Sequence, residues 1–163
     1  MSTISKDVRA VLVRDAREEA VLDGSSAIEA EHLLLGLARL EGSTTARLLA
    51  DHGLTRDSIR AALDREWEGG LSAAGLTVLV SELPRATPDP SRHPAFAESA
   101  KRALKTAADY AVGLGDKRIT AAHMLVGVLD AKLGRVSRTL AQAGIDSAAL
   151  YAQAAAAARA GGH

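Results

Sequence analysis

One eleven-residue segment of this chain occurs twice, and this duplication constrains the fold more than any other feature. AEHLLLGLARL spans residues 30–40 and AAHMLVGVLDA spans residues 121–131, with the histidine and the glycine in register. At the same offset of 91, residues 5–63 and 96–154 share fourteen identities in fifty-nine positions without a gap. Random pairs of this composition would match at roughly a third of that rate. The sequence therefore predicts a tandem duplication.

Each copy shows the apolar spacing of four helices. Apolar residues recur at three- and four-residue steps, and glycines follow where a helix would stop in a left-handed conformation. Gly36 and Gly127 lie in the middle of expected helices at a cost of about 1 kcal/mol each, so we interpret them as helix crossing points rather than ligand contacts. The expected helices cover about residues 5–22, 30–40, 44–53, 54–67, 96–113, 120–131, 134–143 and 146–159.

A linker is expected between the copies. Residues 1–67 form the first repeat, 68–95 the linker, 96–159 the second repeat and 160–163 a tail. Strand signals are nearly absent, and the only β-like run, LTVLV at residues 76–80, falls inside this linker. A loop of this length is long for a compact domain, which favours a mobile or functional segment. The residues that indicate a linker are Gly69, Gly70, Gly75, Pro84, Pro88, Pro90 and Pro94.

Composition excludes several classes of function. The chain has 20 basic and 20 acidic residues, and a net charge of zero disfavours binding to nucleic acid or to an anionic membrane. It has no cysteine, so a disulfide framework or thiolate metal site is impossible, as fits a reducing cytoplasm. The N-terminus is charged, and the longest uncharged runs fall short of the roughly 18 residues that a bilayer span needs. We therefore expect a soluble, cytoplasmic protein.

The charges are unevenly distributed along the chain. Residues 1–67 hold nine basic and twelve acidic side chains, a balance of −3, whereas residues 93–163 hold nine and five, a balance of +4. We expect the two halves to dock against each other, and steering of a partner is the alternative.

His32 and His123 are the candidates for metal or acid–base chemistry. Neither lies in an H-E-x-x-H motif, and Glu29 and Glu31 precede only the first histidine. We therefore expect no metal, no cofactor and no catalytic residue. Each histidine is instead expected in the first turn of its helix, where it satisfies free backbone groups or packs against a neighbouring helix.

Two long segments carry a family resemblance. EEAVLDGSSAIEAEHLLLGLARLEGSTTARLLADHGLTRDSIRAAL and FAESAKRALKTAADYAVGLGDKRITAAHMLVGVLDA resemble the two repeats of the Clp N-terminal (Clp R) domain of ClpC- and ClpA-type AAA+ unfoldases. The shared pattern is EEA, a glycine, an isoleucine, EH before LLLGL, and a later HGL or AGI. The resemblance covers nearly the whole chain. It implies an all-α fold in which two tandem pseudo-twofold four-helix repeats, eight helices, form one compact domain.

The resemblance implies a binding module and no enzyme. The phosphate-binding motif G-x-x-x-x-G-K-[ST] is absent from the sequence, so no ATPase is expected. A stand-alone domain of this kind is expected to bind protein substrates or adaptors of a Clp protease, or cyclic-peptide antibiotics, and to act as adaptor or decoy. The alternative is a structural or regulatory helical protein that recognises no tag and assembles through its alanine-rich last helix.

The resemblance also implies a pocket for phosphorylated arginine at the EH glutamate of each repeat. Glu31 and His32 match this pattern in the first repeat, whereas Ala121 and Ala122 remove the carboxylate from the second. Helix-terminal amides suit a phosphate and a carboxylate suits a guanidinium, although Glu31 also fits a purely stabilising role beside the helix N-terminus. We therefore expect one phosphoarginine-type site per chain, in the first repeat.

A second family surface is a groove between the first helices of the two repeats, where regulators and cyclic peptides dock. Val13, Phe96, Lys101, Leu104 and Lys105 match it, and a core role for Phe96 is the alternative.

Overall fold

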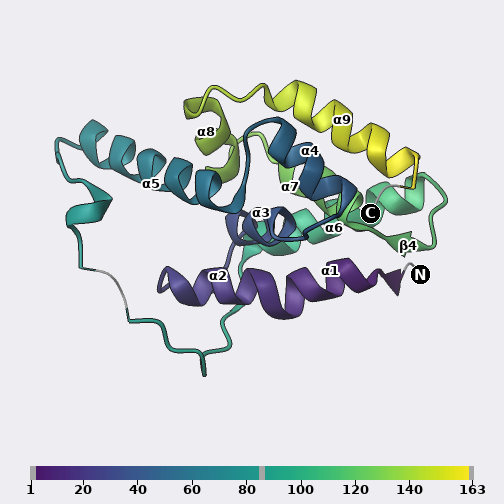
Figure 1. The fold of residues 1–163 in the computed structure, drawn as a ribbon, viewed down its shortest axis with the longest axis horizontal. Coiled ribbons are helices and arrows are strands. Elements are labelled where there is room, and N and C mark those ends of the chain that lie inside the picture. The colour runs from purple at the N-terminus through teal and green to yellow at the C-terminus, as the bar shows by residue number, and fades with distance from the viewer. Residues whose placement is uncertain (1–2, 85–86, 162–163) are drawn as a thin grey trace.

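A computed structural model describes residues 3–84 and 87–161 (Figure 1). Within these residues each repeat has four helices. In the first repeat, the first helix consists of three consecutive segments, of which the middle one is π-helical. The first repeat contains Lys6–Ala10 (α1), Val11–Asp15 (η1), Ala16–Leu22 (α2), Ala30–Ala38 (α3), Thr44–Asp51 (α4) and Arg56–Ala73 (α5). The second contains Glu98–Gly113 (α6), Ala121–Asp130 (α7), Arg135–Gln142 (α8) and Ser147–Arg159 (α9). The predicted all-α fold is confirmed.

Side chains that precede the helices explain where several of them begin. The hydroxyl of Ser5 accepts a hydrogen bond from a backbone amide in the first turn of α1, and Ser43 and Thr55 do the same for α4 and α5. The Asp146 carboxylate caps α9. Such caps satisfy backbone donors that have no partner inside the helix.

Within residues 3–84 and 87–161, four two-residue strands join the repeats. Thr3–Ile4 (β1) pairs in parallel with Arg118–Ile119 (β4), and Ala27–Ile28 (β2) pairs in parallel with Ala95–Phe96 (β3). The strand before the first helix of each repeat thus pairs with the strand before the second helix of the other repeat. The sequence analysis missed these strands because two residues are too few to show an alternating pattern.

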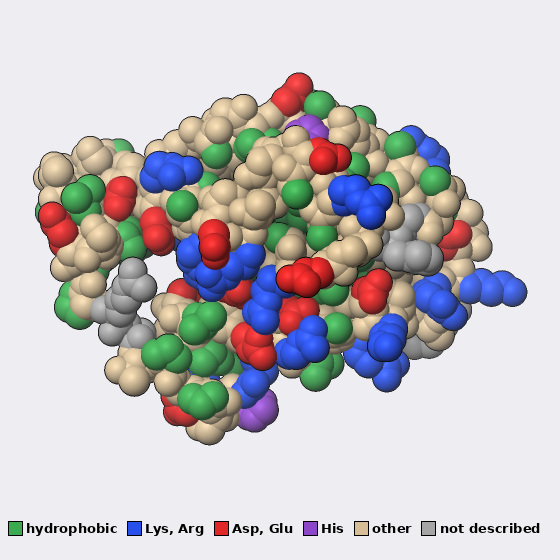
Figure 2. Space-filling model, viewed as in Figure 1, with side chains coloured by type: hydrophobic (Ala, Val, Ile, Leu, Met, Phe, Trp, Pro, Cys, Tyr) green, Lys and Arg blue, Asp and Glu red, His purple; other side chains and the backbone are tan. Residues whose placement is uncertain are grey.

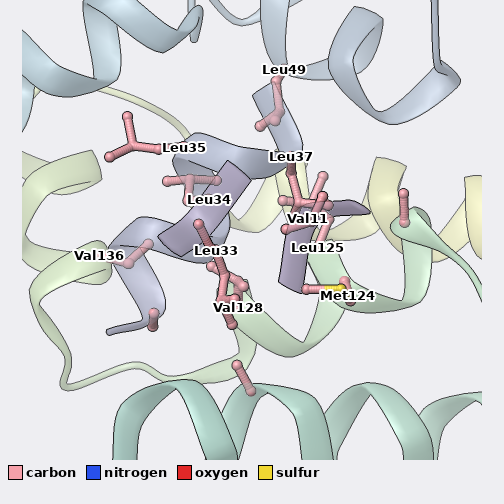
Figure 3. Packing of buried hydrophobic residues seen from close by; sticks show 14 of the residues in the cluster. Val11, Leu33, Leu34, Leu35, Leu37, Leu49, Met124, Leu125, Val128 and Val136 are labelled. Atoms are coloured by element: carbon pink, nitrogen blue, oxygen red, sulfur yellow. The ribbon is translucent and has the colours of Figure 1, made fainter. Parts of the chain in front are cut away.

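The core is built around α3 and α7. The leucines of α3 and the apolar residues of α7 from Ala121 to Val128 are almost completely buried. Figure 3 shows Leu33 and Leu37 of α3 directed toward Val128 and Leu125 of α7. Helices α3 and α7 therefore pack at the centre of the molecule, and the other helices surround them.

The glycines in these two helices allow close helix crossings, as predicted. A Cβ on Gly36 would lie 2.8 Å from Cγ1 of Val11 in η1. A Cβ on Gly127 would lie 2.1 Å from the carbonyl oxygen of Ala103 in α6. Only glycine permits the second approach, because a backbone atom occupies the place of the side chain.

The predicted linker is partly ordered by contacts. Helix α5 continues to Ala73, so residues 68–73 are helical despite two glycines, and Figure 1 shows α5 extending away from the core. Residues 76–79 form no strand, and a 3₁₀ turn, Val80–Glu82 (η2), follows them. The Val80 amide donates to the Glu68 carboxylate at 2.7 Å. Arg17 of α2 donates to the carbonyl oxygens of Pro90 and Arg92, each at 2.6 Å.

Among residues 3–84 and 87–161, no helix combines the length and the apolar character needed to cross a bilayer. The same ranges hold no group of three or more His, Cys, Asp or Glu side chains placed to hold a metal ion.

Candidate functional site

A cleft of about 730 Å³ lies between the start of α3, the first turns of α6 and the loop that joins α7 to α8. Its lining includes the apolar residues Ala30, Ala103, Val128 and Val136, all of them buried. Charged residues of both signs also line it, among them Glu31, Glu98, Arg102, Asp130, Lys132 and Arg135. Because α3 belongs to the first repeat and the other two walls belong to the second, the cleft is an inter-repeat site.

Hydrogen bonds between the repeats hold two of these walls together. The hydroxyl of Ser99 in α6 accepts from the Ala30 amide at 2.9 Å and donates to the Glu29 carboxylate. The amide of Ala97 donates to the Ile28 carbonyl at 2.8 Å. The start of α6 is therefore fastened to the start of α3, where Glu31 lies.

Glu31 is nearly buried and forms an ion pair with the other repeat. Its side chain is 8% exposed, and its Oε1 lies 3.1 Å from Nη1 of Arg135 at the start of α8. Nε of the same arginine lies 3.2 Å from Oε2 of Glu66 in α5, and Arg138 donates to the other Glu66 oxygen at 3.1 Å. Sequence reasoning missed Arg135, Arg138 and Glu66. The only signal was the opposite charge balance of the two halves, which these ion pairs explain in part.

His32 is completely buried, and both ring nitrogens have partners. The Glu29 amide donates to Nδ1 at 2.9 Å, and Nε2 lies 2.7 Å from Oδ2 of Asp23. Because Nδ1 accepts from an N–H group, the ring proton is on Nε2, which donates to the carboxylate. Burial alone would raise the pKa of Asp23, but hydrogen bonds from His32, Ser25 and Arg60 outweigh it and hold this pKa well below its usual range.

His123 has the same arrangement in the second repeat. The Thr120 amide donates to Nδ1 at 3.0 Å, and Nε2 lies 3.0 Å from Oδ2 of Asp116. His32 and His123 therefore each close the first turn of their helix by accepting a hydrogen bond from a backbone amide. This arrangement fits the structural role that the sequence suggested as the alternative to metal or acid–base chemistry. A direct ligand contact by His32 stays a prediction.

A smaller cleft of about 510 Å³ occupies the pseudo-symmetric place. Its lining includes Lys6, Asp7 and Ala10 of α1 and the loop that joins α3 to α4. At the offset of 91, Glu31 corresponds to Ala122 and Arg135 corresponds to Thr44. The carboxylate and the arginine that pairs with it are thus both absent from this second place.

None of the five predicted groove residues lines the Glu31 cleft. Val13 on η1 is 68% exposed, and its equivalent on α6, Leu104, is half-buried. Lys101 and Lys105 are exposed on α6. Phe96 in β3 is half-buried and packs against the core, which fits the alternative role considered for it. Docking at this surface stays a prediction.

A dense ion network lies in the first repeat on the side of α2. Glu19 is 1% exposed and accepts hydrogen bonds from Arg56 at 2.9 and 3.0 Å, from Arg60 at 2.5 Å and from Arg39 at 3.3 Å. Burial alone would raise the pKa of Glu19, but the bonds from Arg56 and Arg60 lower it. Figure 2 shows acidic and basic side chains intermixed across the middle of this face. The network connects α2, α3 and α5, so its role is structural.

Comparison with known proteins identifies the family. A family model, the Clp repeat (R) N-terminal domain, matches residues 3–92 and 95–161. The chain belongs to the Clp repeat (R) N-terminal domain family. A search of curated proteins found no match to this Clp repeat domain.

Solved structures agree on the fold of this Clp repeat domain. The N-terminal domain of the chaperone ClpD from Arabidopsis thaliana is 22% identical with a TM-score of 0.66, over 93% of this chain and 91% of that one. The Hsp104 N-terminal domain from Candida albicans is 15% identical with a TM-score of 0.64, over 94% and 89%. A structure from a malarial protein secretion system is 16% identical with a TM-score of 0.64, over 94% and 92%. The resemblance inferred from the sequence is confirmed.

Proposed function

We propose that this domain is a non-enzymatic module that binds protein substrates or adaptors of a Clp protease system, and that the Glu31 cleft recognises a phosphoarginine-type tag. The Glu31–Arg135 pair is the observation that carries the proposal. A nearly buried carboxylate beside an open cleft already holds a guanidinium there, at 3.1 Å. A phosphoarginine side chain presents the same chemical group, so the carboxylate is suited to it.

The rest of the cleft suits the other parts of such a ligand. Arg102 and Lys132 are exposed residues of its lining and supply positive charge for a phosphoryl group. The apolar part of the lining matches the methylene groups of an extended side chain. The pseudo-symmetric place has Ala122 instead of the glutamate, so we expect one site per chain.

Calorimetric titration tests the tag. A short peptide with one phosphoarginine is titrated into the wild-type chain and into Glu31→Ala, and the same peptide with alanine at that position serves as the ligand control. We expect one site and a loss of roughly ten- to a hundredfold in Glu31→Ala, since a charged hydrogen-bond partner typically contributes about 1.5–3 kcal/mol. Glu41→Ala, which removes an exposed carboxylate near the pseudo-symmetric place, controls for net charge. Two equal sites, or equal binding by Glu31→Ala, would contradict the proposal.

Adaptors and cyclic-peptide antibiotics are assigned to the other surface, which carries Val13, Phe96, Lys101, Leu104 and Lys105. A peptide that binds there should not compete with phosphoarginine, because these residues do not line the Glu31 cleft. In a cell where the domain acts without ATPase modules, both surfaces would make it an adaptor or a decoy for the protease.

A structural or regulatory protein without tag recognition is the second candidate, and Arg135 favours it because this residue already occupies Glu31. Assembly through the last helix is less suited to the fold, since Leu150, Ala154 and Ala158 of α9 are buried in the domain itself. Salt-insensitive self-association without phosphoarginine affinity, measured by sedimentation and calorimetry, would support this candidate.

A further inference from the structure

The guanidinium of Arg135 lies on the boundary of the cleft. Its side chain is 33% exposed and lines the cleft, whereas Glu31 is 8% exposed. Nη1 contacts Glu31, and Nε contacts Glu66, which is not among the residues that line the cleft. Any guanidinium that enters the cleft and binds Oε1 of Glu31 must therefore replace Nη1 of Arg135.

We infer that Arg135 sets the affinity that a ligand of the cleft must overcome: it competes with every incoming guanidinium for Glu31, so that only an arginine with an added anionic group binds well. The inference rests on the proposed function, because it concerns the same site. It concerns the discrimination between tagged and untagged arginine, to which Glu31 alone contributes little.

The physical reason is an exchange of equal contacts. An unmodified arginine gains one charged hydrogen bond to Glu31 and displaces another of the same kind, so little remains to offset the entropy lost on association. A phosphoarginine also presents phosphoryl oxygens to Arg102 and Lys132, and it therefore gains contacts that Arg135 does not make. A competing internal group weakens both ligands by the same factor, so the additional contacts of the phosphoarginine decide which ligand still binds measurably.

Displacement of Arg135 leaves it with a partner. Its Nε stays within reach of Glu66, whose other oxygen is held by Arg138. The Arg135 side chain is already 33% exposed while it is paired. The competition is therefore reversible, and it reduces the apparent affinity of any ligand to the intrinsic affinity multiplied by the fraction of time that Glu31 is free of Arg135.

The duplication provides a second, independent observation. The first place has both Glu31 and Arg135, and the pseudo-symmetric place has Ala122 and Thr44. The carboxylate and its internal competitor are present together or absent together.

The test compares two arginine variants of α8. Arg135→Ala removes the competitor, and Arg138→Ala removes a cation that contacts Glu66 but not Glu31. Each is titrated with a phosphoarginine peptide and with the unmodified arginine peptide. We expect Arg135→Ala to raise the affinity for both peptides by about tenfold or more, so that binding of the unmodified arginine peptide becomes measurable, with Arg138→Ala unchanged. Unchanged affinity for the arginine peptide in Arg135→Ala overturns the inference.

A stability measurement covers the case in which the alanine variant folds poorly. Arg135→Gln keeps most of the side-chain volume and still leaves Glu31 without a cation. Its melting temperature should rise with added N-acetylarginine amide more than that of the wild type, because a ligand that binds the folded state stabilises it. The double variant Glu31→Gln with Arg135→Gln should lose this rise, and an equal rise in the double variant overturns the inference.

The two proposals fail in different ways. If the wild type binds no phosphoarginine peptide but Arg135→Ala gains binding of arginine, the proposed tag is wrong and the competition by Arg135 stands. If the wild type binds the tag and Arg135→Ala changes neither affinity, the tag stands and the role of Arg135 is wrong.

Discussion

The carbonyl oxygen of Ala103 lies where a side chain on residue 127 would begin, 2.1 Å from an ideal Cβ built on Gly127. The amide nitrogen of Ala107 lies 3.0 Å from the same point. Helices α6 and α7 therefore cross with their backbones in contact. The equivalent glycine of the first repeat, Gly36, faces the end of a side chain, Cγ1 of Val11, at 2.8 Å.

This difference predicts unequal effects of two matched substitutions. Gly127→Ala forces α6 and α7 apart, and we expect it to lower the free energy of unfolding by about 2 kcal/mol or more. Gly36→Ala displaces mainly a methyl group and regains helix propensity, so its net effect should stay within about 1 kcal/mol. Urea denaturation followed by circular dichroism measures both. Equal losses would show that the backbone contact at residue 127 is not the decisive one.

Glu19 should be among the most sensitive charged residues. Glu19→Gln leaves Arg56, Arg60 and Arg39 without their shared carboxylate, and we expect a loss of about 3 kcal/mol at neutral pH, as for one partner removed from a buried ion pair. Asp57→Asn is the matched control, because the Asp57 side chain is 90% exposed and pairs only at the edge of this network. A loss below about 0.5 kcal/mol for Glu19→Gln would contradict the structural role.

The same residue predicts how stability depends on pH. The pKa of Glu19 in the folded state is lower than its ordinary value of 4.5. A depressed pKa contributes stability that is fully present above the ordinary value and is lost as the pH falls through the lower, folded-state value. The free energy of unfolding, measured at several values between pH 7 and pH 3, should therefore fall less with decreasing pH for Glu19→Gln than for the wild type. The same pH dependence of the free energy of unfolding in both proteins would contradict this prediction.

His32 and His123 should contribute to stability in the same way. His32→Ala and His123→Ala each remove an acceptor of a backbone N–H and a donor to an aspartate, so we expect losses of about 1–3 kcal/mol in both. Phosphoarginine affinity, measured well below the melting temperature, should fall much less in His32→Ala than in Glu31→Ala. An equal fall would indicate a direct ligand contact by His32 instead.

Transfer of the ion pair to the second repeat tests the pseudo-symmetry. Ala122 is 1% exposed, so Ala122→Glu buries a carboxylate and should lower stability. Thr44→Arg places an arginine at the position equivalent to Arg135, and we expect the double variant to regain a large part of this loss. The coupling free energy, from a double-mutant cycle of urea denaturation, should be about 1 kcal/mol or more. Additive effects would show that the two places differ in backbone geometry.

Local patterns were sufficient for the helical plan. The three- and four-residue apolar spacing marked the helices, and the repeated glycines at 36 and 127 marked the two close crossings. The loss of the second glutamate at Ala122 was visible in the same way. These features are set by residues close together in the sequence, or by the comparison of one copy with the other, and need no knowledge of distant contacts.

Contacts between distant residues decided the site. Glu31 and Arg135 are 104 residues apart, and they meet because β2 pairs with β3 and places the second repeat against the start of α3. Two-residue strands have no sequence period, and an exposed arginine in a helix looks the same whether or not a carboxylate faces it. Helices follow from local backbone hydrogen bonds, whereas an ion pair across two repeats exists only after the hydrophobic core has brought them together.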